Sequence, residues 1–209
     1  MFPEIIKLEG GRSFKGAVLR SAQIIKLGGI VIHPTDTCYG IAADITNHQA
    51  IKNVHAFKNR EDNLFNMIVK DFDQWREYGK LYPINKKIIE KYNNNQFSFI
   101  VPRTKKAPSF FRPGISTLSI QIPKLKFSQD LLKKTSVPLV ATSANLSGAD
   151  ICYTIKDLLN QFTEMDFPFQ TLILDSGKLL GQKPSTLIEM INEKEFKILR
   201  EGDVRKIEL

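Results

Sequence analysis

The sequence predicts an α/β protein built on a twisted sheet of mixed strand direction with flanking helices. Short apolar segments typical of strands alternate irregularly with amphipathic segments typical of helices along the 209 residues. Because the alternation is not strict, the pattern favours a mixed sheet over a purely parallel, doubly wound one. No internal repeat, long linker or low-complexity stretch interrupts the chain. We therefore expect a single domain over residues 1–209, with its core at about 14–203.

Helices are predicted where apolar residues recur at helical spacing behind a residue that can cap a helix. Ser13 and Asn47 are suited to cap the first two helices, and Gly28 follows the first as a stop signal. The expected helices run over 13–27, 47–58, 71–93 with a break at Pro83, 128–134 and 154–162.

Strands are predicted where short β-branched or aromatic runs lie between turn residues. Pro34 ends the first of these runs, and a polar loop follows it. The expected strands cover 30–32, 66–69, 97–101, 117–122, 139–142, 171–174, 186–190 and 197–199.

The composition limits the classes of partner and the compartment. The chain has 30 basic and 22 acidic residues, a formal charge of +8. Such an excess favours an anionic partner such as a nucleotide or RNA, although a solvated lysine-rich surface would look the same. No apolar run approaches the ~20 residues that a membrane helix needs. Two cysteines form no disulfide framework, and the first residues do not resemble a secretory signal, so we expect a cytoplasmic protein.

The most informative segment is 138–148, Pro-Leu-Val-Ala-Thr-Ser-Ala-Asn-Leu-Ser-Gly, in which an apolar run ends in small hydroxyl and amide residues. A strand that delivers polar groups to the mouth of a pocket has this composition, and an ordinary strand and turn can share it. Three other segments also carry polar or charged groups at the end of a predicted element. They are 29–40, Lys58-Asn59-Arg60, and Pro184-Ser185-Thr186 together with Ile198-Leu199-Arg200.

These side chains suit different parts of a nucleotide and a small polar substrate. Thr37 and Tyr39 offer hydroxyl groups that hydrogen-bond without adding charge. Lys58 supplies a compact charge and Arg60 a planar fork, a combination that suits phosphates. On spacing alone, the same pair also fits two surface charges at a helix end.

In this order and at these separations, the four segments resemble the YrdC/Sua5 family of threonylcarbamoyl-adenylate synthases. The resemblance covers residues 28–203. It implies a twisted sheet around a concave, basic cavity, without the second C-terminal domain that longer family members carry. The implied reaction joins L-threonine, bicarbonate and ATP into threonylcarbamoyl-adenylate and releases pyrophosphate. The carbamoyl-threonyl group is then destined for adenosine 37 of certain tRNAs, to give t6A.

The resemblance also implies roles for individual residues. Lys58 and Arg60 would act on the phosphates of ATP and of the developing adenylate. Mg²⁺ would arrive with ATP, and no residue of the chain is expected to ligate a metal. Further partners would be tRNA or other RNA and the machinery that transfers the t6A group, with no membrane involved. The implied ATP contacts are Arg60, Thr117, Asn145, Ser185 and Arg200, and the implied threonine contacts are Thr37, Tyr39 and Ser143.

The chain departs from the family pattern on the amino-acid side. A family strand that reads Val-Arg-x-Pro is Ile120-Gln121-Ile122-Pro123 here, and Val69 stands near the position of a family His. A Gln amide can hydrogen-bond a carboxylate but cannot neutralise it, so threonine binding should be weaker. These departures suggest a divergent, YciO-like member. Two alternatives stay open: a nucleotide- or RNA-binding protein without threonine activity, and a synthase of another carbamoyl or acyl adenylate.

Overall fold

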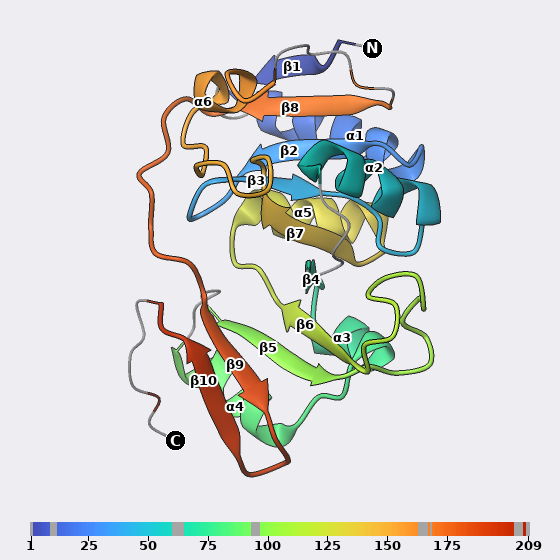
Figure 1. The fold of residues 1–209 in the computed structure, drawn as a ribbon, viewed down its shortest axis with the longest axis vertical. Coiled ribbons are helices and arrows are strands. Elements are labelled where there is room, and N and C mark those ends of the chain that lie inside the picture. The colour runs from blue at the N-terminus through green and yellow to red at the C-terminus, as the bar shows by residue number, and fades with distance from the viewer. Residues whose placement is uncertain are drawn as a thin grey trace.

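The fold is a mixed α/β arrangement in which one ten-stranded sheet runs through the whole molecule (Figure 1). We describe a computed structural model over residues 2–8, 12–59, 65–92, 97–162, 167, 169–202 and 207, with only the backbone at 12 and 13. The strands are β1 (Glu4–Lys7), β2 (Ile30–Pro34), β3 (Tyr39–Ala42), β4 (Asn66–Ile68), β5 (Phe97–Pro102), β6 (Thr117–Gln121), β7 (Leu139–Ser143), β8 (Thr171–Asp175), β9 (Thr186–Met190) and β10 (Phe196–Arg200). The helices are α1 (Arg12–Lys26), α2 (His48–Lys58), α3 (Phe72–Tyr78), α4 (Pro83–Tyr92), α5 (Lys126–Thr135) and α6 (Ile155–Leu159).

The strand order is β1-β8-β2-β3-β7-β4-β6-β5-β9-β10, with parallel and antiparallel neighbours mixed. In Figure 1 the first five strands form the upper half of the molecule and the last five form the lower half. The two halves join where β7 pairs antiparallel with β4, for example at Val140 and Met67. The predicted fold class, an α/β fold with a mixed sheet, is confirmed.

The upper half buries both faces of its sheet, which explains the continuous apolar run of β2. Val31 packs in a cluster with residues of α1 and α5. Its neighbours Ile30 and Ile32 belong to the other cluster, which includes apolar residues of α2. Since successive side chains of a strand point to opposite faces, a strand covered on both sides must be apolar throughout.

All eight predicted strands are present, and the structure adds two that the sequence pattern did not reveal. β1 is an edge strand of four residues, too short to show an alternation. β3 lies inside the polar motif at 29–40 and turns back on β2 as a hairpin, with Tyr39 opposite Pro34. Its residues are fully buried, so its signal was masked by the polar turn that precedes it.

Of the two predicted helix caps, Asn47 is confirmed and Ser13 is wrong. The Asn47 side chain accepts hydrogen bonds from the backbone N–H groups of Gln49 and Ala50, at 2.9 and 3.2 Å, and so caps α2. By contrast, α1 already begins at Arg12, which places Ser13 inside the helix rather than at its cap.

No helix among the described residues has both the length and the apolar character to cross a membrane.

His33 on β2 gives the fold a dependence on pH. Its ring is buried against the Phe127 ring, with centroids 5.3 Å apart, and its Nδ1 lies 3.0 Å from the Pro34 carbonyl oxygen. Burial lowers the pKa of His33 to about 4 from its ordinary 6.5. The folded protein therefore holds this imidazole neutral where the unfolded chain would protonate it.

We predict that acid weakens the fold through His33. Between pH 6.5 and 4 the unfolded chain binds the proton and the folded chain does not, so the free energy of unfolding falls as the pH falls. The loss approaches about 3 kcal/mol at pH 4. His33→Asn keeps a donor near the Nδ1 position and should flatten this dependence in urea unfolding from pH 7 to 4. His48→Asn, at an exposed position, is the control, and equal pH slopes in all three proteins would contradict the prediction.

Candidate functional site

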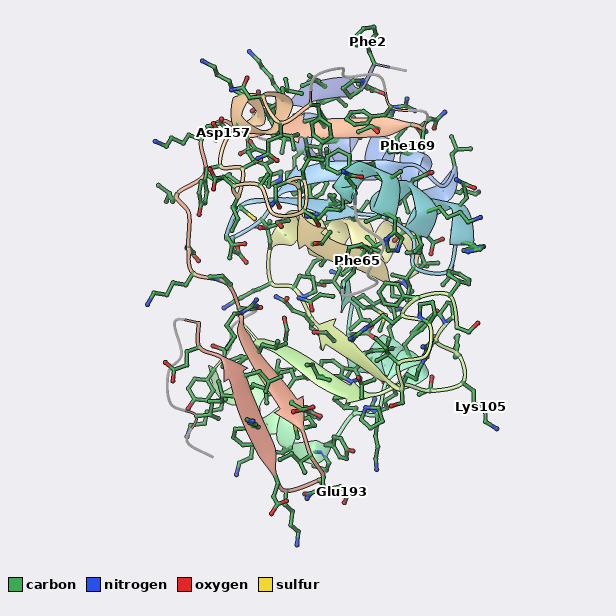
Figure 2. All side chains as sticks on the ribbon, viewed as in Figure 1. Phe2, Phe65, Lys105, Asp157, Phe169 and Glu193 are labelled. Atoms are coloured by element: carbon green, nitrogen blue, oxygen red, sulfur yellow. The ribbon has the colours of Figure 1, made fainter. Side chains whose placement is uncertain are left out.

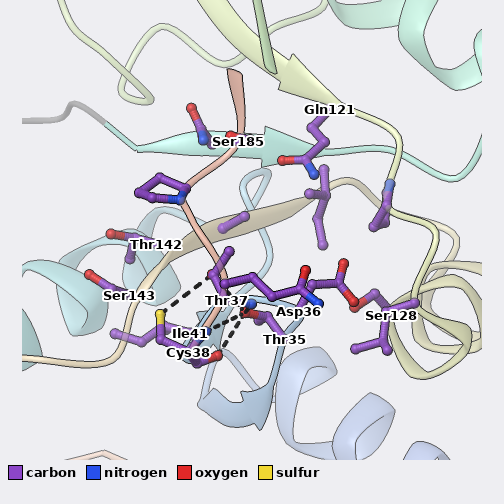
Figure 3. Close-up of a pocket in the computed structure, with 18 of the residues that line it drawn as sticks. Thr35, Asp36, Thr37, Cys38, Ile41, Gln121, Ser128, Thr142, Ser143 and Ser185 are labelled. Carbon is purple, nitrogen blue, oxygen red and sulfur yellow. Dashed lines mark hydrogen bonds between the residues drawn. The ribbon is translucent and has the colours of Figure 1, made fainter. Parts of the chain in front are cut away.

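A cavity of about 450 Å³ lies between the two halves of the sheet. Figure 3 shows Thr37 and Ser143 on one side of it and Ser185 and Gln121 on the other. Its remaining polar lining comes from the turn before β3, the end of β7, the start of β4, α5 and the connections around 151–153 and 182–187. Residues from distant parts of the chain thus meet around one cavity, which has both polar and apolar lining.

The turn between β2 and β3 presents Thr37 to the cavity. The Thr35 hydroxyl donates to the Cys38 carbonyl at 2.7 Å and accepts the backbone N–H groups of Thr37 and Cys38, both at 3.2 Å. One hydroxyl therefore fixes the whole turn. Gly40 lets the turn approach closely, because a Cβ there would stand 2.8 Å from the Thr35 methyl group.

Lys58 lies behind the cavity wall rather than in it. The side chain of this residue is almost fully buried, and its Nζ donates to the Ser143 carbonyl at 2.8 Å and to Asn145 Oδ1 at 3.2 Å. The Ser143 hydroxyl donates to the same Asn145 oxygen at 2.5 Å. Lys58 and Asn145 thus hold the turn after β7, and Ser143 is the member of this group that lines the cavity.

The opposite wall is a chain of neutral hydrogen bonds that ends in a guanidinium. The Ser98 hydroxyl donates to Gln121 Oε1 at 3.2 Å and lies 2.9 Å from the Ser185 hydroxyl. Asn66 Nδ2 donates to Ser98 at 3.4 Å. Arg200 donates from Nε and from one terminal nitrogen to the Ser185 carbonyl, at 3.0 and 2.9 Å. Ser98, fully buried on β5, was not predicted, because a lone serine in an apolar strand carries no sequence signal of its place.

The two thiols near the cavity are held in their neutral form. Burial raises the pKa of the Cys38 thiol, and it raises that of Cys152 to about 11, so neither is an activated thiolate. Burial also lowers the pKa of Arg200, a group that stays charged at neutral pH. Among the described lining residues the charged side chains are Arg200 and Asp36. The expected basic character of the cavity stays a prediction.

Besides Lys58 and Asn145, three further residues expected at the site do not line the cavity in the described structure or lie outside the described residues. The Tyr39 hydroxyl donates to the Gly177 carbonyl at 2.8 Å and accepts the Ser176 N–H at 2.9 Å, so it ties β3 to the chain after β8 and does not line the cavity. Burial raises its pKa to about 12. Thr117 starts β6, at the opposite end of that strand from Gln121. Arg60 lies outside the described residues.

The part of the chain that the structure describes contains no group of three or more His, Cys, Asp or Glu side chains that could hold a metal ion. Asp36, beside two threonine hydroxyls, is the carboxylate in the described lining. Oxygen donors of this kind fit Mg²⁺, which usually takes one or two carboxylates together with phosphates and water.

The comparisons with known proteins indicate one and the same family. Residues 23–202 match the family model Sua5_yciO_yrdC, whose description is "Telomere recombination". A Methanocaldococcus jannaschii protein named putative threonylcarbamoyl-AMP synthase is 32% identical over 177 residues, or 84% of this chain and 80% of that protein.

Two solved structures share the fold. P. abyssi Sua5, in complex with L-threonine, aligns with a TM-score of 0.81 at 21% identity, covering 97% of this chain and 58% of that one. E. coli YciO aligns with a TM-score of 0.76 at 22% identity, covering 95% of this chain and 94% of that one. The chain therefore spans little more than half of the Sua5 chain but almost all of YciO.

We predict that Lys58 stabilises the wall of the cavity. Lys58→Met leaves the Ser143 carbonyl and Asn145 Oδ1 without their buried cationic donor, which should lower the free energy of unfolding by about 1.5–3 kcal/mol. Urea unfolding measures the loss. Lys52→Met, at an exposed position of the same helix, is the matched control and should change stability little. Equal unfolding free energies in the two variants would contradict the prediction.

Proposed function

Because this chain belongs to the Sua5, YciO and YrdC family, we propose that it is an L-threonylcarbamoyladenylate synthase that serves the t6A modification of tRNA. One observation carries the proposal. Thr37 and Ser143 from one half of the sheet face Ser185 from the other half across a single cavity, which Arg200 also lines. Neutral hydroxyls on one side suit an amino acid, and a guanidinium on the other suits a nucleotide. The name of the M. jannaschii relative supports the same reaction.

The proposed chemistry needs no nucleophilic side chain. L-threonine and bicarbonate condense to the N-carboxylate of threonine with loss of water. An oxygen of this carbamate attacks the α-phosphorus of ATP, and the bond to the leaving pyrophosphate breaks. Catalysis is then alignment and stabilisation of charge, which agrees with a site whose thiols and buried imidazole are held neutral.

The residues of the chain divide this work. Thr37 and Ser143 orient the amino acid, while Ser185 and Arg200 hold the nucleotide. Lys58 keeps the turn that carries Ser143 in place, and movement of its Nζ toward the phosphates would break the contacts that fix this turn. Mg²⁺ bound to ATP would offset the phosphate charge as pyrophosphate leaves, and Asp36 is the described carboxylate that could contribute to holding it.

A second candidate function is the synthesis of a different carbamoyl or acyl adenylate. The observation that favours it is the neutral chain from Gln121 through Ser98 to Ser185, because a substrate carboxylate would find an amide here rather than a charge. A nucleotide- or RNA-binding protein without synthase activity is the remaining alternative. Mass analysis of the products formed from ATP, bicarbonate and mixed amino acids separates the three.

We predict that nucleotide binding depends on Arg200. Arg200→Ala removes a charge-assisted contact to phosphate and should weaken ATP binding about tenfold or more in calorimetry. Lys197→Ala, at an exposed position of the same strand, removes an equal charge and should leave the affinity unchanged. If both variants bind ATP as the unmodified protein does, Arg200 is not part of the nucleotide site.

We further predict that the unmodified protein binds ATP well and L-threonine weakly. Gln121→Arg supplies the missing positive charge and should improve use of L-threonine about tenfold in an assay of pyrophosphate release. Gln23→Arg, at an exposed position on α1, adds the same charge far from the cavity and is the control. Strong use of threonine by the unmodified protein would show that Gln121 does not limit the amino-acid side.

A further inference from the structure

The loop between β5 and β6, residues 103–116, is strongly cationic. It lies in the lower half of the molecule (Figure 1). Its Phe110 ring packs against the His48 ring at the start of α2, with centroids 4.8 Å apart. No acidic residue occurs anywhere in the sequence between Glu90 and Asp130. The loop therefore holds no carboxylate to offset its own charge. Its cations are Arg103, Lys105, Lys106 and Arg112.

Three of these cations are either paired, hydrogen-bonded or exposed to solvent. Lys106 forms an ion pair with Glu77, and Lys105 points away from the molecule into solvent (Figure 2). Arg103 donates from one terminal nitrogen to the carbonyls of Arg112 and Ile115, and from the other to those of Ala107 and Pro108. The Arg103 guanidinium thus holds the loop in its conformation through hydrogen bonds to four carbonyl oxygens.

Arg112, by contrast, is buried without such partners among the described residues. It is only 8% exposed, yet its Nε meets no hydrogen-bond partner and it takes part in no ion pair among the described residues. Arg103 occupies the nearby carbonyls, and the Arg112 carbonyl is itself one of them. Burial and repulsion from Arg103 both lower the pKa of Arg112. The Nε–H group of Arg112 is thus a buried donor without an acceptor, which is costly because buried polar groups normally hydrogen-bond.

The backbone holds Arg112 in this position at a further cost. Its φ is +65°, in the left-handed region that residues with a Cβ seldom adopt. Phe111 before it is fully buried and anchors the loop, while Arg103 donates a hydrogen bond to the carbonyl of Arg112 itself. The guanidinium is therefore held in place by its surroundings rather than by contacts of its own.

We propose that Arg112 is the centre of a binding site for a small phosphate-class oxyanion, distinct from the cavity between the two halves of the sheet. A planar guanidinium matches two oxygens of a phosphate, and Arg103 adds a second positive charge nearby. A dianion such as inorganic phosphate would offset both. The low exposure of Arg112 favours a free, small anion over the backbone of a nucleic acid, which could not enter so enclosed a position. Arg112 is not among the residues that line the cavity.

The first test uses the unmodified protein. The Nε–H resonance of Arg112 should shift progressively as inorganic phosphate replaces chloride at constant ionic strength, in a ¹H–¹⁵N spectrum of the arginine side chains. Arg112→Lys identifies the resonance by its disappearance. An Arg112 resonance that does not respond to phosphate overturns the proposal.

The second test measures the stabilisation of the fold by phosphate, which follows from binding to the folded state alone. Arg112→Asn removes the guanidinium but tolerates a positive φ, and it should weaken phosphate binding about tenfold or more. Arg112→Lys keeps the charge without the planar fork and should weaken it to a smaller extent. Lys105→Gln, which removes one exposed charge from the same loop, should retain the response of the unmodified protein.

Arg200→Ala separates this site from the cavity. If phosphate stabilises the protein only through the cavity, the response disappears in Arg200→Ala and persists in both Arg112 variants, and the proposal fails. If Arg112 is the centre of the site, the response persists in Arg200→Ala and falls in the Arg112 variants. A loss in Lys105→Gln equal to that in Arg112→Asn would indicate general charge attraction and would also overturn the proposal.

Discussion

The antiparallel pairing of β7 with both β3 and β4 is the constraint on which the rest of this structure depends. β7 is the strand that joins the two halves of the sheet, with Ile41 opposite Thr142 on one side and Met67 opposite Val140 on the other. The cavity opens beside this junction. Because β7 pairs with both neighbours, it sets the separation of the two walls. The strand ends at Ser143, and the polar turn that carries Asn145 follows directly.

The buried charge of Lys58 couples helix packing to that turn. Its ammonium donates to the carbonyl of Ser143, the last residue of β7, and to the Asn145 amide oxygen just beyond the strand, so α2 and the cavity wall are fixed to each other. A charge taken out of water demands such partners, since its desolvation is otherwise uncompensated. A residue type that suits phosphate binding thus serves here to position the residues that line the site.

Arg200 and Arg103 illustrate the same principle in the lower half. Each guanidinium donates mainly to backbone carbonyls, which orient a loop without placing a carboxylate beside the cation. The positive charge is then available to an anion that arrives from outside. Gln121 and Ser98, on the same wall as Arg200, carry no charge, so this wall is neutral at one end and positively charged at the other.

The sequence by itself determined eight of the ten strands and the segments that form the site. Apolar runs such as 30–32 and 139–142 marked strands because strands buried on both faces must be apolar, and Asn47 marked a helix start because its side chain can accept backbone N–H groups. The polar ends of these elements marked Thr37, Ser143, Ser185 and Arg200, which the fold brings to one cavity. Their catalytic and binding roles stay predictions.

Only the tertiary structure decided which of the candidate side chains face the cavity. Local patterns do not determine the direction in which a side chain points once distant strands pair. Tyr39 and Ser143 were both predicted to contact threonine, although Tyr39 ties down the chain after β8 and Ser143 lines the cavity. Ser98 and Arg112 carried no pattern at all. Their significance comes from burial and from the presence or absence of hydrogen-bond partners, which are properties of the packed chain and not of any segment of it.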